Sequence, residues 1–428
     1  MPELLKLSWP TSASSGLSRK NRRGCDYEAY VPDPLGGRSI SLSGETAADV
    51  TEAERAVERL NRDASGLADS EAVARLLLRA EAVASSKIEG LEVGGRRLLK
   101  AQAALGLGDD TSDVTAAEVL NNIEAMRWAI DTLSVADRIT VEDILGIHER
   151  LLTGTTLQRY AGAPRDQQNW IGGSSHNPCS AAFVPPPSDR VRELMEDLCR
   201  FCDQDSLPAV AQAALAHAQF ETIHPFIDGN GRTGRVLIHV ILRRRGLAPV
   251  VVAPVSLVLA TWSRDYVNGL TSTRYRNAPD SREALDALDS WIGLFAAATR
   301  RAVADAETYE RRVADLQQAW RHRLGRVRSD SAVDRLINAL PGAPVVTVQS
   351  AAALIGRSEQ AVNEAVPRLE QAGVLKQTNL GRRNRAFEAT DLIDAFTDLE
   401  RQLAIPDGDT RLSPPRRPVP RPRASRGA

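Results

Sequence analysis

The sequence is poor in cysteine: its 428 residues include only Cys25, Cys179, Cys199 and Cys202. So few cysteines in so long a chain argue against a disulfide framework and indicate a reducing compartment. The sequence also lacks the run of about 18 apolar residues that a membrane-spanning helix requires, and its N-terminus lacks the apolar stretch of a signal peptide. We therefore expect a cytoplasmic protein without a membrane partner.

Net charge is also nearly absent, with a formal value of −1. No overall field therefore attracts the protein to nucleic acid, and only local patches can do so. The composition, 43% apolar and 25% charged residues, is typical of globular proteins. A chain of this length accommodates two or three domains, and it can bury a core without disulfides.

Apolar residues recur at steps of three and four over most of the chain, which predicts a mainly α-helical fold. Residues 1–45 show little periodicity, so we expect an irregular or partly disordered segment there. Helical patterns follow over residues 46–110 and 111–303, and residues 304–328 resemble a connecting helix. Within the second region, residues 168–173 and 183–187 form two short extended pieces, which predict a hairpin or flap.

Residues 329–403 have the pattern of a small winged-helix domain, with three helices before two short strands that flank a candidate wing at residues 381–385. The region has eight basic and ten acidic residues, and its candidate recognition helix carries Glu359, Glu364 and Glu370. Because phosphate contacts dominate DNA affinity, we favour a protein-interaction or dimer role over nucleic-acid binding. The basic, proline-rich tail, residues 404–428, is predicted to be disordered.

The most informative segment is residues 224–235, HPFIDGNGRTGR. Gly229 and Gly231 allow backbone amides to approach a ligand closely. A helix that starts near Arg232 adds unpaired N–H groups and the positive end of its dipole, which together make an anion site. The nearest alternative is a Walker-type phosphate loop, but the segment lacks the Lys-Ser/Thr ending and follows a predicted helix instead of a strand.

Charged side chains complete this segment. Arg232 and Arg235 are three residues apart, so they share a helical face and can clamp phosphate oxygens. Asp228 can bind the Mg²⁺ that accompanies a nucleotide. His224 can accept a proton near neutral pH.

The segment matches the Fic-family motif His-x-Phe-x-Asp/Glu-Gly-Asn-Gly-Arg-x-x-Arg at every fixed position, so the chain resembles Fic-family AMP transferases. The resemblance implies a Fic-type helical core and transfer of AMP from ATP to Ser, Thr or Tyr hydroxyls of target proteins, or of the enzyme itself. It implies that His224 is the general base and that Asp228 binds Mg²⁺. It assigns the nucleotide phosphates to Gly229, Asn230, Gly231, Arg232 and Arg235.

Two further stretches extend the resemblance. The segment with Ile171, Gly172 and Gly173 is similar to the family's target-binding flap, whose edge pairs with a target strand; an ordinary hairpin that covers the core is the alternative. Tyr266 lies where many members carry two adjacent tyrosines near the nucleotide base. Since only one tyrosine is present, UTP and other donors stay open.

A second motif, SSKIEG at residues 85–90, fits the family's inhibitory pattern Ser/Thr-x-x-x-Glu-Gly/Asn. Ser85 and Glu89 are one helical turn apart and share a face. The resemblance implies that Glu89 pairs with Arg235 and restrains the enzyme. The alternative is a helix that stops at Gly90, which explains the glycine and leaves the glutamate without a role.

Several other residues have less informative patterns. The Cys199 and Cys202 pair has zinc-site spacing but too few partner ligands, so we expect buried thiols. The three helical histidines, His148, His217 and His239, are expected to be packing or surface residues. A transcriptional regulator with a nucleotide-sensing Fic core remains an alternative to the enzyme, although an intact His224 favours the enzyme. The sequence leaves the oligomeric state open, a homo-oligomer included.

Overall fold

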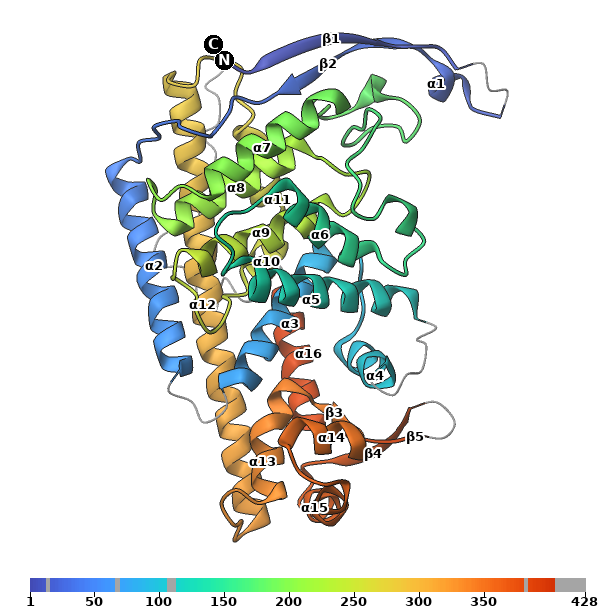
Figure 1. Ribbon diagram of the computed structural model, residues 1–428, viewed down its shortest axis with the longest axis vertical. Coiled ribbons are helices and arrows are strands. Elements are labelled where there is room, and N and C mark those ends of the chain that lie inside the picture. The colour runs from blue at the N-terminus through green and yellow to red at the C-terminus, as the bar shows by residue number, and fades with distance from the viewer. Residues whose placement is uncertain (13–15, 66–69, 106–112, 381–383, 405–428) are drawn as a thin grey trace.

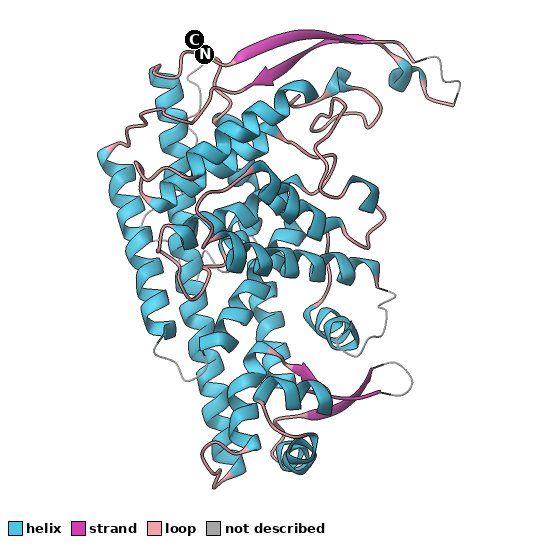
Figure 2. Cartoon of the chain, viewed as in Figure 1, coloured by secondary structure: helices cyan, strands magenta, loops and turns pink. Residues whose placement is uncertain are grey.

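The structure is a computed structural model that describes all residues except 13–15, 66–69, 106–112, 381–383 and 405–428. Figure 2 shows that helices make up most of the chain, which confirms the mainly α prediction. The helix termini explain much of this. For example, the Thr140 side chain and the Asp143 carboxylate cap the start of α6 (Val141–Leu152) reciprocally, which satisfies N–H groups that a helix start leaves unpaired.

The N-terminal segment is a β-hairpin, so the expectation of an irregular residue 1–45 region is wrong. Strand β1 (Glu3–Trp9) pairs antiparallel with β2 (Cys25–Val31), from Glu3 opposite Val31 to Trp9 opposite Cys25. The short helix α1 (Arg19–Arg22) lies between them. Each strand has only seven residues, and polar residues interrupt the alternation of apolar side chains. A search for longer periodic patterns therefore does not detect these strands.

Three helices follow the N-terminal hairpin directly in the described part of the chain. Helix α2 (Gly44–Ser65) packs along the 43-residue α12 (Arg282–Leu324), which runs along most of the long axis in Figure 1. Helix α3 (Ser70–Ile88) is buried over most of its length and packs on the central helices α5 and α10, and α4 (Gly95–Leu105) follows it. Helix α12 is continuous through residue 303, where we expected the core to end and a separate connecting helix to begin.

The centre of the protein is α8 (Ala209–Ile223), in which every residue is buried. Its many alanines let neighbouring helices approach on all sides, and a helix without a polar face belongs inside a core. Around it pack α7 (Val191–Cys202), α9 (Asn230–Arg244) and α12. The remaining core elements are α5 (Val114–Leu133), α6, α10 (Val255–Thr261), α11 (Ser263–Ser272) and the short helices η1 (Gln158–Tyr160), η2 (Pro178–Ser180) and η3 (Ser188–Arg190).

The C-terminal elements follow the predicted order, with one further helix at the end that was not predicted. They are α13 (Ala332–Ala339), η4 (Leu340–Gly342), β3 (Val345–Val346), α14 (Val348–Ile355), α15 (Glu359–Gln371), β4 (Lys376–Leu380), β5 (Asn384–Glu388) and α16 (Thr390–Ala404). The three strands form an antiparallel sheet in the order β3-β5-β4. The winged-helix assignment stays a prediction. Most of the candidate wing and nearly all of the predicted tail lie outside the described residues.

The cysteines divide into two pairs. Cys25 and Cys179 form a disulfide across 154 residues, so the expectation of a chain without disulfides is wrong. Spacing could not reveal it, because the partners meet only through the tertiary fold. Cys199 and Cys202 are free and buried, as predicted. Among the described helices, none is both long and apolar enough to cross a bilayer.

Candidate active site

The predicted phosphate loop connects two buried helices. His224 caps the C-terminus of α8 in a left-handed conformation, with φ 49° and ψ 60°, and this turns the chain sharply out of the helix. Gly229 (φ 77°) is the N-cap of α9, so this helix begins at Asn230, two residues earlier than expected. The backbone N–H groups of its first turn have no carbonyl partner within the helix, and they surround a potential anion site.

Asn230 and Phe226 hold the loop in shape. The Asn230 amide accepts from the Phe226 N–H and donates to the Phe226 carbonyl, each at 2.9 Å. Phe226 is fully buried. Because both ends of the Asn230 side chain are engaged within the loop, the phosphate contact predicted for this residue is left to its backbone N–H.

His148 supports the same loop from α6, which the sequence analysis missed by treating it as a packing residue. Its ring stacks on Phe226 with centroids 3.7 Å apart. Its Nδ1 accepts from the Gly162 N–H at 3.2 Å, and its Nε2 lies 3.0 Å from the Asp228 carbonyl. A neutral ring with the proton on Nε2 satisfies both contacts, and burial lowers the pKa of His148 to about 4.

His224 is positioned by its backbone. Its carbonyl accepts from Arg165 Nε at 2.9 Å and from Asn169 Nδ2 at 3.4 Å. Its imidazole is 20% exposed, and Nδ1 lies 3.9 Å from Glu221 Oε2. Burial, and next the charges of Arg165 and Arg274, lower the pKa of His224 to about 4. The imidazole is therefore neutral at pH 7 and can accept a proton.

The two arginines of α9 differ in their partners. Arg232 is 2% exposed, and its Nη2 lies 3.6 Å from Asp228 Oδ2. Its Nε and Nη1 have no hydrogen-bond partner within the described part of the chain. Arg235 by contrast donates to Ser85, Glu89 and Tyr266. Buried donors without a partner are rare and costly, so Arg232 is the side chain best prepared for an anionic ligand.

Glu89 lies at the start of α9, beside Gly231 and Arg235. Its Oε1 accepts from Arg235 Nη2 at 2.6 Å, and the same oxygen lies so close to the α9 backbone that a side chain on Gly231 would overlap it. Ser85 accepts from Arg235 Nε through its hydroxyl and from Nη2 through its carbonyl, each at 2.9 Å. Burial raises the pKa of Glu89, but the charge and the hydrogen bond of Arg235, together with the charge of Arg232, outweigh it and hold this pKa below its usual value.

Tyr266 is part of this network and does not face solvent. Its hydroxyl accepts from Arg235 Nη1 at 3.3 Å and lies 2.8 Å from His217 Nε2. Its ring stacks on His217 and packs against Trp291. In this arrangement Tyr266 supports Arg235. Its ring is covered by His217 and Trp291, so it is not available to contact a nucleotide base. His217 likewise belongs to the support of the site.

The flap lies directly against the loop. Ile171 forms an antiparallel bridge with Phe183, which agrees with the two extended pieces expected here. Gly172 and Gly173 follow with φ of 75° and 77°. Asn169 Nδ2 donates to the Phe226 carbonyl at 3.1 Å. The base of the flap is thereby tied to the segment that carries His224.

Other side chains of the site had no signal in the sequence. Arg165 also donates to the Pro186 and Gln167 carbonyls, and Arg274 lies 3.6 Å above the Phe183 ring. Both are single arginines in irregular segments, and only the fold brings them near His224. Asp228 is 49% exposed at the mouth of the loop. In the described ranges, no group of three or more His, Cys, Asp or Glu side chains could hold a metal by itself.

Comparison with known proteins agrees with this arrangement. Residues 138–242 match the model of the Fic/DOC family, and residues 47–131 match that of the Fic/DOC family N-terminal region. The two matched stretches, 105 and 85 residues long, together cover 190 of the 428 residues, and over them the chain is similar to Fic/DOC proteins. Its relatives include two proteins named protein adenylyltransferase Fic, from Nematostella vectensis and Drosophila willistoni, 37% and 38% identical over 138 residues. The alignments cover 32% of this chain and 30% and 26% of those proteins, so the chain spans less than a third of their length.

The fold has a counterpart of known structure. The crystal structure of a Fic family protein from Desulfovibrio desulfuricans G20 is similar with a TM-score of 0.50 and 21% identity. The similarity covers 82% of this chain and 97% of that one. This confirms the mainly α Fic core.

Proposed function

We propose that this Fic protein transfers AMP from ATP to hydroxyl groups of target proteins and of itself. The observation that carries the proposal is the neutral His224 in the same loop as a buried Arg232 whose Nε and Nη1 have no hydrogen-bond partner among the described residues. The name of the curated relatives, protein adenylyltransferase, supports the same reaction. Nucleotidyl transfer needs mainly positioning and charge stabilisation, together with a base for the nucleophile.

In the proposed reaction, His224 accepts the proton of the target hydroxyl. The hydroxyl oxygen then forms a bond to the α-phosphorus of ATP, the bond from this phosphorus to the bridging oxygen breaks, and pyrophosphate leaves. The first-turn N–H groups of α9 and the free donors of Arg232 stabilise the negative phosphate oxygens. The flap at Ile171, Gly172 and Gly173 holds the target segment near His224.

Asp228 fits the requirement for Mg²⁺. Its carboxylate is half exposed at the mouth of the loop, and Mg²⁺ is commonly bound by one or two carboxylates together with substrate phosphates. When bound, the ion would neutralise phosphate charge. Asp228 also remains near Arg232, so a cation there and the guanidinium would contact neighbouring parts of the nucleotide.

We further propose that Glu89 inhibits the enzyme. Its carboxylate takes up Arg235 Nη2 and lies against Gly231, where the outer phosphates of ATP would bind. The family resemblance also allows Glu89 a second role in removing AMP from a labelled target. Since the Tyr266 ring is covered, the choice of ATP over UTP rests on the resemblance and not on a base contact.

For the rest of the chain we propose the predicted division. Residues 46–110 carry the inhibitory motif, residues 111–303 form the catalytic core and residues 329–403 form a protein-interaction module. The cytoplasmic location also remains a prediction, and the Cys25–Cys179 disulfide counts against the reducing compartment on which it rests.

Intact-mass spectrometry tests the proposal. The wild type and the Glu89→Gly form are incubated with Mg²⁺ and either ATP or UTP, and a mass increase of one nucleotide unit per site is sought. We expect AMP addition by Glu89→Gly with ATP and none when His224→Ala is added. Labelling that persists undiminished in His224→Ala would overturn the role of His224. Addition of UMP from UTP, with no addition of AMP from ATP, would show that UTP is the donor.

A further inference from the structure

The N-terminal hairpin and the flap form one continuous surface. The Tyr30 N–H of β2 donates to the Val184 carbonyl of the flap at 3.0 Å. The Tyr30 ring packs against Phe183, and Trp9 of β1 meets Trp170 edge to face with centroids 5.3 Å apart. The hairpin thus covers one edge of the flap.

At the opposite edge of the flap, no backbone hydrogen bond reaches Trp170 or Gly172 from any described residue. Ile171 exchanges hydrogen bonds with Phe183, at 2.8 Å and 3.2 Å. In an antiparallel pair, the backbone groups of the neighbouring residues then point to the other side, here those of Trp170 and Gly172. This edge can accept a target strand, and one end of that strand would lie at the flap tip.

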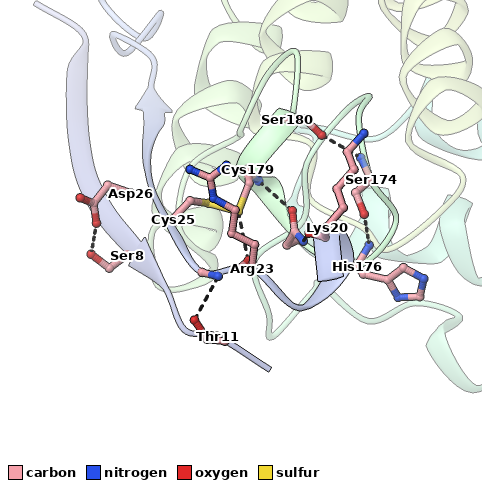
Figure 3. The surroundings of a disulfide bond; sticks show 12 residues. Ser8, Thr11, Lys20, Arg23, Cys25, Asp26, Ser174, His176, Cys179 and Ser180 are labelled. Carbon is pink, nitrogen blue, oxygen red and sulfur yellow. Dashed lines mark hydrogen bonds between the residues drawn. A yellow bond between two sulfur atoms is a disulfide. The ribbon is translucent and has the colours of Figure 1, made fainter. Parts of the chain in front are cut away.

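The flap tip is fastened to α1 of the hairpin (Figure 3). The Ser174 hydroxyl donates to Asn21 Oδ1 at 3.1 Å. Asn177, which is 2% exposed, donates to the carbonyls of Asn21 and Lys20 at 3.0 and 3.3 Å. The Cys25–Cys179 disulfide joins the start of β2, which follows α1 closely, to η2, which follows the flap tip. Helix α1 therefore has a defined position beside the flap tip.

Helix α1 and the residue after it are strongly basic. They carry Arg19, Lys20, Arg22 and Arg23, and residues 10–24 contain no acid. Three of the four side chains are exposed, and within the described part of the chain none of the four forms an ion pair. The nearest acid in sequence, Asp26, accepts from the Ser8 hydroxyl at 2.5 Å. This positive patch contrasts with the near-zero net charge of the whole protein.

We propose that this basic patch, Arg19, Lys20, Arg22 and Arg23, is a docking surface for an acidic segment of the protein target. The proposal rests on the proposed function, because it places the acidic segment next to the hydroxyl that receives AMP. The Asn21 contacts and the disulfide hold the patch where a strand paired with Trp170 and Gly172 leaves the flap. Substrate selection thereby combines a sequence-independent strand pairing with a charge requirement beside it.

Fluorescence anisotropy with the full-length protein tests this surface. A labelled peptide with one Ser-Tyr pair followed by glutamates is compared with the same peptide carrying glutamines. We expect the glutamate peptide to bind about tenfold more tightly, since several exposed ion pairs contribute weakly and together, and the preference to weaken at high salt. Equal binding of the two peptides, or binding of neither, overturns the proposal.

Charge-reversal variants locate the effect. Changing Arg19, Lys20, Arg22 and Arg23 to glutamate should abolish the preference for the glutamate peptide. The matched control is Arg326→Glu with Arg328→Glu, two exposed arginines beyond α12 at the other end of the molecule, which should retain it. Loss of the preference in both variants, or in neither, contradicts the assignment. AMP transfer that fails while the preference persists counts against the proposed function and not against this surface.

A separate measurement tests the role of the Cys25–Cys179 disulfide. Cys25→Ser with Cys179→Ser, and separately a dithiol reductant added to the wild type, should each weaken glutamate-peptide binding about threefold or more, since the patch loses its covalent link to the flap. The reductant should have no further effect on the double variant, which retains Cys199 and Cys202. Unchanged binding after reduction of the wild type removes the disulfide from the proposal.

Discussion

Glu89 and Arg235 are 146 residues apart in sequence, and Glu89 Oε1 lies 2.6 Å from Arg235 Nη2. The arginine is 1% exposed while the glutamate side chain is 34% exposed. The pair therefore joins the buried, preorganised guanidinium of Arg235 to the partly exposed carboxylate of Glu89, which can move away from it. A guanidinium that already has Ser85 and Tyr266 as partners needs no rearrangement when the carboxylate leaves.

The first prediction follows from this pair. Glu89→Gly should raise the initial rate of AMP transfer about tenfold to a hundredfold, because misplacement of reacting groups costs rates of this order. Adding Arg235→Ala should lower the rate again. The rates are measured with excess ATP, and pre-labelled protein is checked separately for loss of AMP. The control is Glu92→Gly, an exposed glutamate on the same connection, and an equal rise there would remove the inhibitory role of Glu89.

The second prediction concerns the pH dependence of His224. Because its pKa is lowered to about 4, the imidazole becomes neutral as the pH rises through about 4. The single-turnover rate of Glu89→Gly should then rise with pH on a limb well below the usual histidine value of 6.5 and stay level near pH 7. Circular dichroism at each pH verifies folding. A limb centred at 6.5 or higher would contradict a buried, neutral base.

The third prediction separates binding from stability at Arg232. Its Nε and Nη1 lack partners among the described residues, so Arg232→Ala removes few polar contacts of the folded state besides the ion pair with Asp228. ATP affinity should fall about tenfold or more, as expected for a charge-assisted contact of about 1.5–3 kcal/mol, while the melting temperature should not fall. Arg232→Lys should recover part of the affinity. Calorimetric titration and thermal unfolding measure the two effects, and reduced stability with unchanged affinity would make Arg232 a structural residue.

The fourth prediction concerns the support of the loop by His148. Replacing it with alanine removes the stack on Phe226 and the bridge between the Gly162 N–H and the Asp228 carbonyl. We expect unfolding free energy to fall by about 2–4 kcal/mol and AMP transfer by about a hundredfold. Denaturant unfolding and transfer rates below the melting transition measure both. A full transfer rate in the folded variant would show that the loop keeps its shape without His148.

The fifth prediction concerns stability and Glu310 of α12. Burial, and next the charges of Glu307 and Asp63, raise the pKa of Glu310 to about 7 from 4.5. Between these values the folded state binds the extra proton, so its stabilising contribution is present at low pH and is lost as the pH rises through about 7. Glu310→Gln should therefore stabilise the protein at pH 8, by about 1–3 kcal/mol, and little at pH 5. Denaturant unfolding at both pH values provides the measurement, and equal effects at both would exclude a shifted pKa.

Much of the site could be read from sequence because its groups are local. Residues 224–235 connect two helices, so His224, the two glycines and the two arginines had to lie close together whatever the rest of the fold. The helices themselves followed from apolar periodicity, since one buried face is enough to specify them. The inhibitory role of Glu89 came from a resemblance and remains a proposal, although the predicted contact with Arg235 is present.

The sequence by itself determined the mainly helical class, the close grouping of residues 224–235 and the resemblance to the Fic/DOC family. Only the tertiary structure decided that Cys25 meets Cys179, that Tyr266 supports Arg235 from a buried position, and that a hairpin covers one edge of the flap. These outcomes depend on contacts between segments more than a hundred residues apart, except for the Tyr266 contact, which spans 31. No spacing encodes such contacts, because they follow from how helices and strands pack, and packing is settled by the whole core at once.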